Sequence, residues 1–151
     1  MLSTFASQHW ILIALIFFGL LGYVALIRWQ DQRWIESRFG GEKIRVVSFG
    51  IIFLGVTSDS GPIRRSSGFL ILTDERLFFR SRRRNLELDI PGKRILEVYH
   101  DVRHRGEEVH QSLMMLDFIN ENRRRDTAAF RVPYPPQWIQ AVLATHKEKN
   151  G

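Results

Sequence analysis

Residues 68–81, GFLILTDERLFFRS, contain two short apolar runs on either side of the polar segment Thr73-Asp74-Glu75. Runs of this length, rich in residues that favour strands and separated by a polar break, predict a β-hairpin with strands at 70–72 and 77–79. Asp74 is a turn residue whose side chain can bond its own backbone, so we expect it to close the turn. The whole chain after Arg38 can be organised around this hairpin.

Strand-like patterns continue on both sides of the hairpin. Residues 44–56 predict one long strand bent at Gly50, because the run is too short and too polar to cross a membrane. Alternating apolar positions then predict strands near 86–90, 95–100, 112–120 and 126–132, with a charged turn over 101–110. The residues expected to face inward on three of these strands are Leu86, Leu88, Ile90, Met114, Leu116, Phe118, Ala128, Phe130 and Val132. Residues 137–147 predict an amphipathic helix with Trp138, Ile139, Val142, Leu143 and His146 along one side.

Seven strands followed by one helix is the layout of a small barrel plugged by that helix. The hairpin resembles the G-x-L-x-L-T-x-x-R-L-x-F pattern of GRAM domains, which belong to the pleckstrin-homology (PH) superfold. The resemblance covers roughly residues 42–148 and implies a mainly β, seven-stranded PH-like barrel with a C-terminal helix carrying the usual tryptophan. An OB-fold or lipocalin-like barrel fits less well, because one needs an internal helix and the other more strands. The matching residues are Gly68, Leu70, Leu72, Thr73, Arg76, Leu77, Phe79 and Trp138.

Residues 10–27 form an uninterrupted run of 18 uncharged residues, and residues 1–27 contain no Lys, Arg, Asp or Glu. As a helix this run is about 27 Å long, close to the thickness of a hydrocarbon core, and it predicts a single transmembrane helix. A buried core helix would show a polar stripe. A cleaved signal peptide would have a positive start and a small-residue cleavage site, and neither is present.

Basic residues flank the apolar run on one side only. Because such residues stay on the cytoplasmic side, we expect the N-terminus outside and the following domain in the cytoplasm. The chain then divides into a short outer segment (1–9), the span (10–27), a polar connector (28–42) that ends at a Gly-Gly pair, and the PH/GRAM-like domain (43–148). The residues expected at the membrane interface are Trp10, Arg28, Trp29, Arg33 and Trp34.

Arginines are concentrated in the expected turns after the first, third and sixth strands. Alternate turns of an antiparallel meander emerge at the same end, and the resemblance implies that the turn after the sixth strand joins them, while Arg103 and Arg105 are expected elsewhere. Together the clusters would form a basic rim for an anionic ligand, although charged turns also simply keep strands soluble. The rim residues are Arg64, Arg65, Arg80, Arg82, Arg83, Arg84, Arg123, Arg124 and Arg125.

Catalytic and metal-binding patterns are weak in this chain. The absence of cysteine excludes thiolate metal sites, disulfides and thiol catalysis. His100, His104 and His110 lie in a charged turn, which favours surface histidines over a zinc site. No nucleophile lies in an elbow motif. We therefore expect no enzyme activity, no metal and no cofactor.

The sequence predicts a membrane-anchored binding module. Its expected partners are anionic lipid headgroups or an acidic protein at the cytoplasmic membrane surface, and a pure protein scaffold is a further possibility. Phosphoinositide specificity is not expected, since residues 51–54 are apolar where phosphoinositide-binding PH domains usually carry a lysine. Nucleic acid is a less favoured partner, because the hairpin is expected to bury Phe69, Phe78 and Phe79, which leaves no stacking platform.

Overall fold

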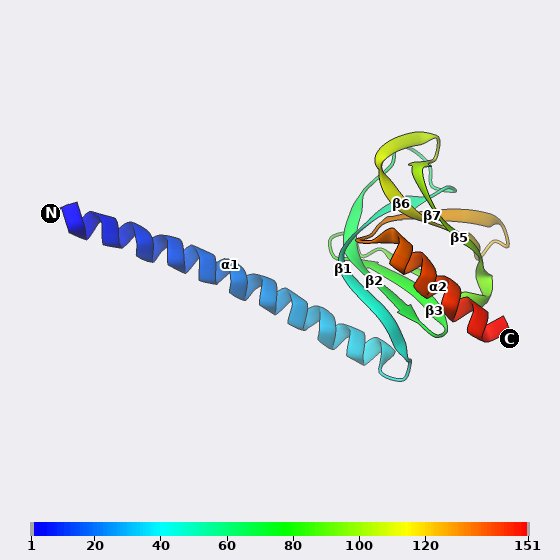
Figure 1. Cartoon of the computed structure of the whole chain (residues 1–151), viewed down its shortest axis with the longest axis horizontal. Coiled ribbons are helices and arrows are strands. Elements are labelled where there is room, and N and C mark those ends of the chain that lie inside the picture. The colour runs from blue at the N-terminus through cyan, green and yellow to red at the C-terminus, as the bar shows by residue number, and fades with distance from the viewer. Residues whose placement is uncertain (1, 151) are drawn as a thin grey trace. The chain divides into compact units, whose positions relative to one another are not determined.

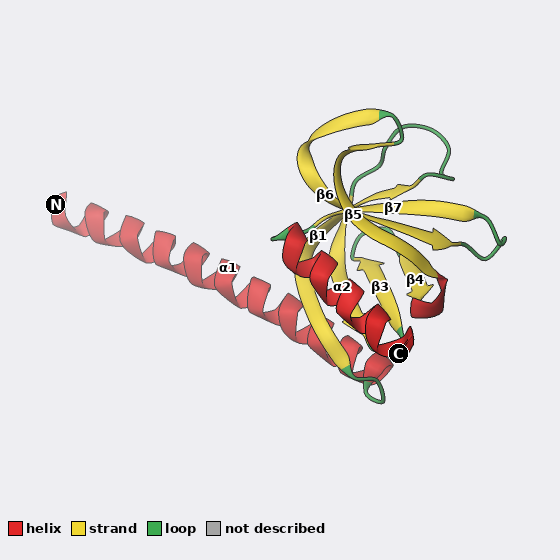
Figure 2. Ribbon diagram, turned by 45° about the vertical axis from the view of Figure 1, so that its right-hand side comes forward, coloured by secondary structure: helices red, strands yellow, loops and turns green. Residues whose placement is uncertain are grey.

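The computed structural model describes residues 2–150, with side chains described for residues 8–146. The chain divides after Gly41 into two compact units. The first unit contains helix α1 (Leu2–Phe39), and the second contains seven strands, one short 3-10 helix (Gly92–Arg94) and helix α2 (Pro135–Asn150). Figures 1 and 2 show the two units, and each is described by itself below.

Helix α1 is continuous through the apolar run and the polar connector. The segment Gln8–Phe39 is long and apolar enough to cross a membrane, and none of the side chains in its most apolar part is buried. A signal sequence near an N-terminus satisfies the same test of length and composition. The helix ends before Gly40, where a Cβ atom would lie 2.7 Å from the carbonyl oxygen of Glu36, so this glycine suits a helix terminus.

The second unit is a single antiparallel sheet of seven strands in the order β4-β3-β2-β1-β7-β6-β5. It rolls up so that one face encloses the core, and α2 packs against β5 and β6 at one opening (Figure 2). The layout confirms the mainly β architecture predicted from the sequence. The strands are β1 (Ile44–Val56), β2 (Ser66–Thr73), β3 (Arg76–Ser81), β4 (Glu87–Pro91), β5 (Ile95–His104), β6 (Glu107–Ile119) and β7 (Arg125–Arg131).

Strand β1 joins the two halves of the sheet. Its first part pairs with β2 and its last part with β7, and its register shifts between Phe49 and Ile51, around Gly50 with a φ of 70°. A positive φ is readily adopted by glycine. The bend predicted at Gly50 is confirmed.

The core is built around three phenylalanine rings, Phe53, Phe79 and Phe130, whose centroids lie 5.1–5.8 Å apart. Trp138 of α2 is 4% exposed and closes the same apolar cluster together with Val142. The predicted plug residue is therefore confirmed. Offset aromatic contacts of this kind stabilise a core beyond the area that they bury.

Two inward assignments are wrong. Leu143 of α2 is 42% exposed, because the buried face of the helix runs through Trp138, Ala141 and Val142 instead. Leu86 is also exposed, since it precedes β4 and lies in the turn after β3. The other inward positions predicted on β4, β6 and β7 face the core.

A second apolar cluster lies on the opposite face of the β5-β6-β7 half. It contains Leu54, Leu113, Met115 and Ala129, and Ile63 from the β1-β2 loop packs against it. Strands β5 and β6 are longer than predicted. Residues 101–110 form a strand hairpin that turns at Arg105-Gly106, with an irregular register between Asp101 and Arg103.

The hairpin predicted over residues 68–81 is confirmed, but a different side chain closes its turn. The hydroxyl of Thr73, not the carboxylate of Asp74, closes the turn by accepting the backbone N–H groups of Glu75 and Arg76 at 3.2 and 3.1 Å. Asp74 instead pairs with Arg45. At the other end of the hairpin a Cβ atom on Gly68 would lie 1.8 Å from the carbonyl oxygen of Arg80, so β3 passes too close for any side chain there.

Candidate functional site

An open hollow of about 420 Å³ lies where three strand connections meet. These are the β1-β2 loop, the β3-β4 turn and the β5-β6 turn, and each contributes one arginine to the lining: Arg64, Arg84 and Arg105. Ser60 and Ser66 add hydroxyl groups. We call this feature the basic hollow and the part of the barrel that carries it the basic end.

The start of the β1-β2 loop is fixed to β7 through Asp126. This buried carboxylate accepts the Thr57 hydroxyl at 2.6 Å, the Ser58 backbone N–H at 3.0 Å and the Ser58 hydroxyl. Burial alone would raise the pKa of Asp126, but these hydrogen bonds outweigh it and lower the pKa below its usual value. The carboxylate therefore stays ionised and holds the loop.

Asp59 makes the next turn of the loop. Its carboxylate accepts the Val56 backbone N–H at 3.0 Å, and its own N–H bonds the Val56 carbonyl at 3.1 Å. Gly55 has a φ of 91°, and a Cβ atom there would come within 2.7 Å of the Asp59 carboxylate. Asp59 also places its carboxylate in the lining of the basic hollow, where the backbone contact holds it and leaves its negative charge in place.

Arg105 reaches the loop from the β5-β6 turn. Its Nη2 atom donates to the carbonyl oxygens of Asp59 at 2.6 Å and Gly61 at 2.7 Å. Figures 1 and 2 show the β5-β6 hairpin and the β1-β2 loop side by side. The expectation that Arg105 lies elsewhere on the barrel is wrong, because the β5-β6 hairpin extends to this loop.

The positive charge of the basic hollow is not neutralised by ion pairs. Within the described residues, neither Arg64 nor Arg84 pairs with a carboxylate, and both side chains are exposed. Arg105 is held by two carbonyl oxygens, which satisfy the N–H groups of its Nη2 atom and leave its charge in place. Arginine in this condition suits two-point binding of phosphate or carboxylate groups.

The remaining rim arginines do not line the basic hollow. Arg65 lines a shallow crease with Arg131 on the outer face of the sheet. Arg80 lies within β3 and pairs with Glu87 of β4 at 3.8 Å. Arg125 begins β7, where its Nε donates to Asp117 at 3.1 Å. The other exposed arginines, in the turns after β3 and β6, are Arg82, Arg83, Arg123 and Arg124.

His104 precedes Arg105 and is only 2% exposed, so the expectation of a surface histidine is wrong here. Neither ring nitrogen has a hydrogen bond of good geometry with a described residue. Burial, and then the charge of Arg105, lower the pKa of His104, while the Gly55 backbone, Asp59 and Asp126 act in the opposite direction. Among the described residues, no cluster of three His, Asp or Glu side chains is arranged to hold a metal ion.

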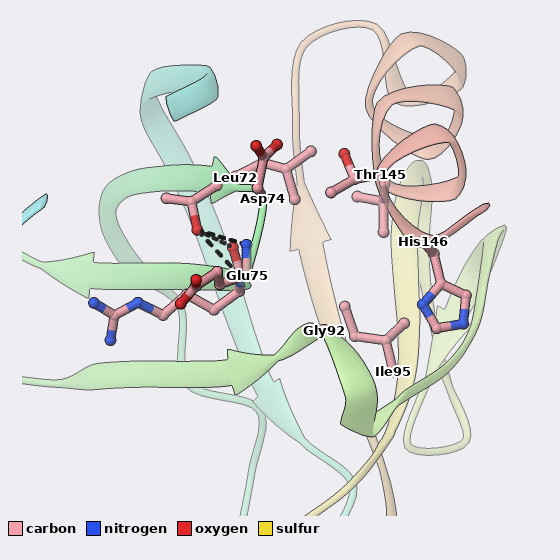
Figure 3. A pocket seen from close by; sticks show the side chains of 10 residues that line it. Leu72, Asp74, Glu75, Gly92, Ile95, Thr145 and His146 are labelled. Carbon is pink, nitrogen blue, oxygen red and sulfur yellow. Dashed lines mark hydrogen bonds between the residues drawn. The ribbon is translucent and has the colours of Figure 1, made fainter. Parts of the chain in front are cut away.

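The opposite end of the barrel, which we call the hairpin end, carries the β2-β3 turn and the start of β1. A narrow crevice of about 10 Å³ lies there. Figure 3 shows its lining, which includes Thr145 and His146 of α2 and the turn residues Asp74 and Glu75. Its volume is too small for a ligand larger than a water molecule. This crevice is therefore not a candidate ligand site.

Arg76 of the hairpin end is fully engaged by carboxylates. It pairs with Glu42 and, at 2.8 Å, with Asp89, while Thr73 donates to Glu42 at 2.9 Å. Burial would raise the pKa of Glu42, but the hydrogen bonds from Arg76 and Thr73 lower it. These contacts explain why threonine and arginine are three residues apart in the hairpin.

Two tryptophans of the connector in α1 carry arginines over their rings. The guanidinium carbon of Arg33 lies 4.2 Å from the ring centroid of Trp29, and that of Arg38 lies 5.9 Å from Trp34. Residues four apart share a helix face, so the sequence already contains both pairs. Trp10 and Arg28 are exposed on the same helix. The pairs place amphipathic rings and positive charges on one segment.

The comparisons with known proteins support a fold. No protein-family model and no curated protein sequence matches the chain. Among solved structures, the Vps36 N-terminal PH domain superposes with a TM-score of 0.53 and 15% identity, over 73% of this chain and 83% of that chain. The chain therefore has a PH-like fold.

Two further structures agree with this fold. The C-terminal domain of an unknown protein from Leishmania infantum gives a TM-score of 0.54 and 13% identity, over 78% of this chain and 95% of that one. A chain of the 8S snRNP assembly intermediate gives a TM-score of 0.54 and 6% identity, over 69% of this chain and 82% of that one. At such identities the likeness concerns the fold alone.

Proposed function

We propose that this chain is a membrane-anchored, non-catalytic PH-like binding module whose basic hollow contacts anionic lipid headgroups at the cytoplasmic membrane surface. The observation that carries the proposal is the convergence of Arg64, Arg84 and Arg105 from three separate connections on one hollow. PH-like folds commonly serve as binding or adaptor modules, so the fold agrees with this role.

The chemistry of the basic hollow selects for anions. Each arginine near a charged membrane surface contributes about 1 kcal/mol, and the Asp59 carboxylate offsets one of the three lining arginines, so the hollow supplies roughly 2 kcal/mol. This attraction is screened over about 8 Å at physiological ionic strength. Binding should therefore be measurable at low salt and weaken strongly as salt is added.

The proposed anchor is the apolar part of α1. Arg28, Arg33 and Arg38 follow this part, and residues 1–9 contain no Lys or Arg, which favours the barrel on the cytoplasmic side. The connector from Arg28 to Phe39, which is helical, spans roughly 18 Å. A tether this short would hold the module at high effective concentration near headgroups.

Vesicle binding tests the proposal. The full chain is reconstituted in nanodiscs of neutral phosphatidylcholine and mixed with sedimentable vesicles, either of phosphatidylcholine alone or with phosphatidylserine added. We expect co-sedimentation only with the phosphatidylserine vesicles, and loss of it when salt rises to about 0.5 M, where screening shortens. Equal sedimentation with both vesicles would contradict a headgroup site.

A matched pair of charge-reversal variants separates the basic hollow from diffuse charge. Arg64→Glu/Arg84→Glu reverses two arginines of the hollow, and Arg123→Glu/Arg124→Glu reverses two in the turn after β6, outside it. We expect the first variant to abolish vesicle binding and the second to retain most of it. Equal losses would mean that net charge, and no organised site, attracts the membrane. Unchanged vesicle binding in both variants would mean that another surface of the chain contacts the membrane, and it would contradict the role of the basic hollow.

A further inference from the structure

Among the described residues, one side chain from another element, Arg105, is hydrogen-bonded to the middle of the β1-β2 loop. Asp126 holds residues Thr57 and Ser58, and Ile63 packs on the second apolar cluster. Between these two points, Arg105 ties the loop to the β5-β6 turn by donating from Nη2 to the carbonyl oxygens of Asp59 and Gly61. Arg64 follows Ile63, so its place at the hollow depends both on the packing of Ile63 and on the hold of Arg105 on residues 59–61.

The β5-β6 turn is built in an unusual way around Arg105. Arg105 and Gly106 both have positive φ, 53° and 78°, which is the pattern of a two-residue type I′ hairpin turn. Asn, Asp or Gly is preferred at the first position. Another residue there adopts strained backbone at a cost of roughly 1 kcal/mol or more. An arginine at this position is best explained by what its side chain does.

The approach of the turn to the loop is also built into β6. The β5-β6 register moves from Asp101 opposite Leu113 to Arg103 opposite Glu108, so extra residues bulge from β6. His110, within this bulge, has a φ of 54°. Bulges bend a strand pair and re-aim its side chains. Here the bend accompanies the contact between the β5-β6 turn and the β1-β2 loop.

The guanidinium group is suited to hold two carbonyls at once. One Nη atom of Arg105 serves both Asp59 and Gly61, which leaves the other N–H groups of its planar fork available toward the hollow that it lines. Because the acceptors are neutral, the positive charge at the edge of the hollow is kept. A carboxylate in their place would hold the loop equally well and cancel that charge.

We infer that Arg105 is a positioning residue of the basic hollow: it clamps the middle of the β1-β2 loop and so holds Arg64 across the hollow from Arg84. The inference rests on the proposed function, since it gives this clamp a role in anion binding. The third connection that lines the site is then the β5-β6 turn. The sequence analysis predicted the turn after β6 in its place.

The clamp itself is tested without any ligand. Hydrogen exchange is measured on the full chain in phosphatidylcholine nanodiscs for wild type, Arg105→Ala and Arg103→Ala. Arg103 is an exposed neighbour in β5, so its variant removes the same charge without removing the clamp. We expect faster exchange over residues 58–64 in Arg105→Ala alone. Unchanged exchange in that variant, or the same acceleration in both, overturns the clamp.

A double-mutant cycle tests whether the clamp acts through Arg64. Binding to phosphatidylserine vesicles is compared for Arg64→Ala, Arg105→Ala and the double variant. Each single loss should weaken binding about fivefold or more, equivalent to about 1 kcal/mol per arginine. If Arg105 acts by positioning Arg64, the double variant binds about as well as the weaker single variant. Losses that multiply show two independent charges and overturn the positioning role.

The two tests keep the inference separate from the proposed function. If wild type ignores phosphatidylserine vesicles while exchange accelerates in Arg105→Ala, the headgroup proposal fails and the clamp stands as a loop anchor. If wild type binds phosphatidylserine vesicles and Arg105→Ala leaves hydrogen exchange unchanged, the headgroup proposal is supported and the clamp is contradicted.

Discussion

The two ends of the barrel use the same residue type in opposite ways. At the hairpin end Arg76 is surrounded by the carboxylates of Glu42 and Asp89. At the basic end Arg64 and Arg84 form no ion pair with any described residue, and Arg105 contacts only neutral carbonyls in the hydrogen bonds assigned to it. The first arrangement stabilises the fold, and the second leaves positive charge available for a ligand.

The difference teaches that arginine content alone does not locate a site. A guanidinium group that is paired on two sides offers little to an incoming anion, whereas one held by carbonyls or left exposed keeps its full charge. The carboxylates near each arginine therefore decide its role. Variants at the two ends should accordingly affect different measurements, and variants in the shared core should affect both.

Loss of the core plug should have the largest effect, because both ends depend on it. Trp138→Ala removes a large buried ring and should lower the free energy of unfolding by roughly 3 to 5 kcal/mol. Thermal unfolding of the full chain in detergent measures this loss. Leu143→Ala in the same helix is the control, since Leu143 is exposed, and its unfolding temperature should hardly change. A tolerant Trp138→Ala would mean that α2 does not close the core.

The closest backbone approach in the hairpin gives the next largest effect. Gly68→Ala would place a Cβ atom 1.8 Å from the Arg80 carbonyl oxygen, and strands β2 and β3 would have to separate. We expect a destabilisation of about 1 to 3 kcal/mol or more, as for other overpacked sites. Ser67→Ala, at the exposed neighbouring position, should be nearly neutral. Similar unfolding curves for both variants would refute the close approach.

Arg76→Ala should sharpen the comparison between the ends. It leaves Glu42 and Asp89 without their shared partner, and because these groups are partly exposed we expect a loss of only about 1 to 2 kcal/mol. Vesicle binding of the folded variant should stay near that of wild type. Loss of binding in a folded Arg76→Ala would show that the hairpin end also takes part in it.

Acidification tests the buried histidine behind the basic end. The pKa of His104 is lowered in the folded chain, so the unfolded chain takes up the proton first as the pH falls below about 6.5. Stability present above that pH should therefore decrease by up to about 1 kcal/mol toward pH 5.5. Thermal unfolding at pH 7.5 and 5.5 measures this, and His104→Phe should remove most of the difference. An equal difference in the variant would place the titration elsewhere.

Three hydrogen-bonded carboxylates affect stability at lower pH than His104 does. The pKa values of Glu42, Asp117 and Asp126 are lowered by their hydrogen bonds, which outweigh the effect of burial. Their contribution to stability is present above their ordinary values near 4 and is lost as the pH falls further. Comparison at pH 7.5 and 5.5 therefore isolates the histidine.

Local patterns sufficed to predict most of the fold. The alternation of Met114, Leu116 and Phe118, the bend at Gly50 and the tryptophan in the last helix all follow from period, glycine and aromatic signals, and all are confirmed. The turn of the central hairpin was predicted at the right place with the wrong side chain. Thr73 and Asp74 are both turn residues, and only the position of Arg45 opposite Asp74 decides between them.

The site was harder to predict because it depends on contacts between distant segments. Arg64 and Arg84 were identified as rim residues from their turns, but Arg105 was assigned elsewhere. Its contact with Asp59 and Gly61 joins residues more than forty positions apart, and a bulge in β6 lies beside it. The Arg105-Gly106 pair, a hairpin turn with an unsuitable first residue, was the one local signal for it.

If the basic end binds the ligand while the contacts at the hairpin end stabilise the fold, two variants measured side by side should separate these roles. Vesicle binding and thermal unfolding are measured together on full-length Arg84→Glu and Arg76→Ala. We predict that Arg84→Glu loses phosphatidylserine binding and unfolds within about 0.5 kcal/mol of wild type, as exposed sites generally do. Arg76→Ala should keep phosphatidylserine binding and lose stability. If Arg84→Glu binds like wild type, or if both variants lose stability equally, the division of roles between the two ends is contradicted.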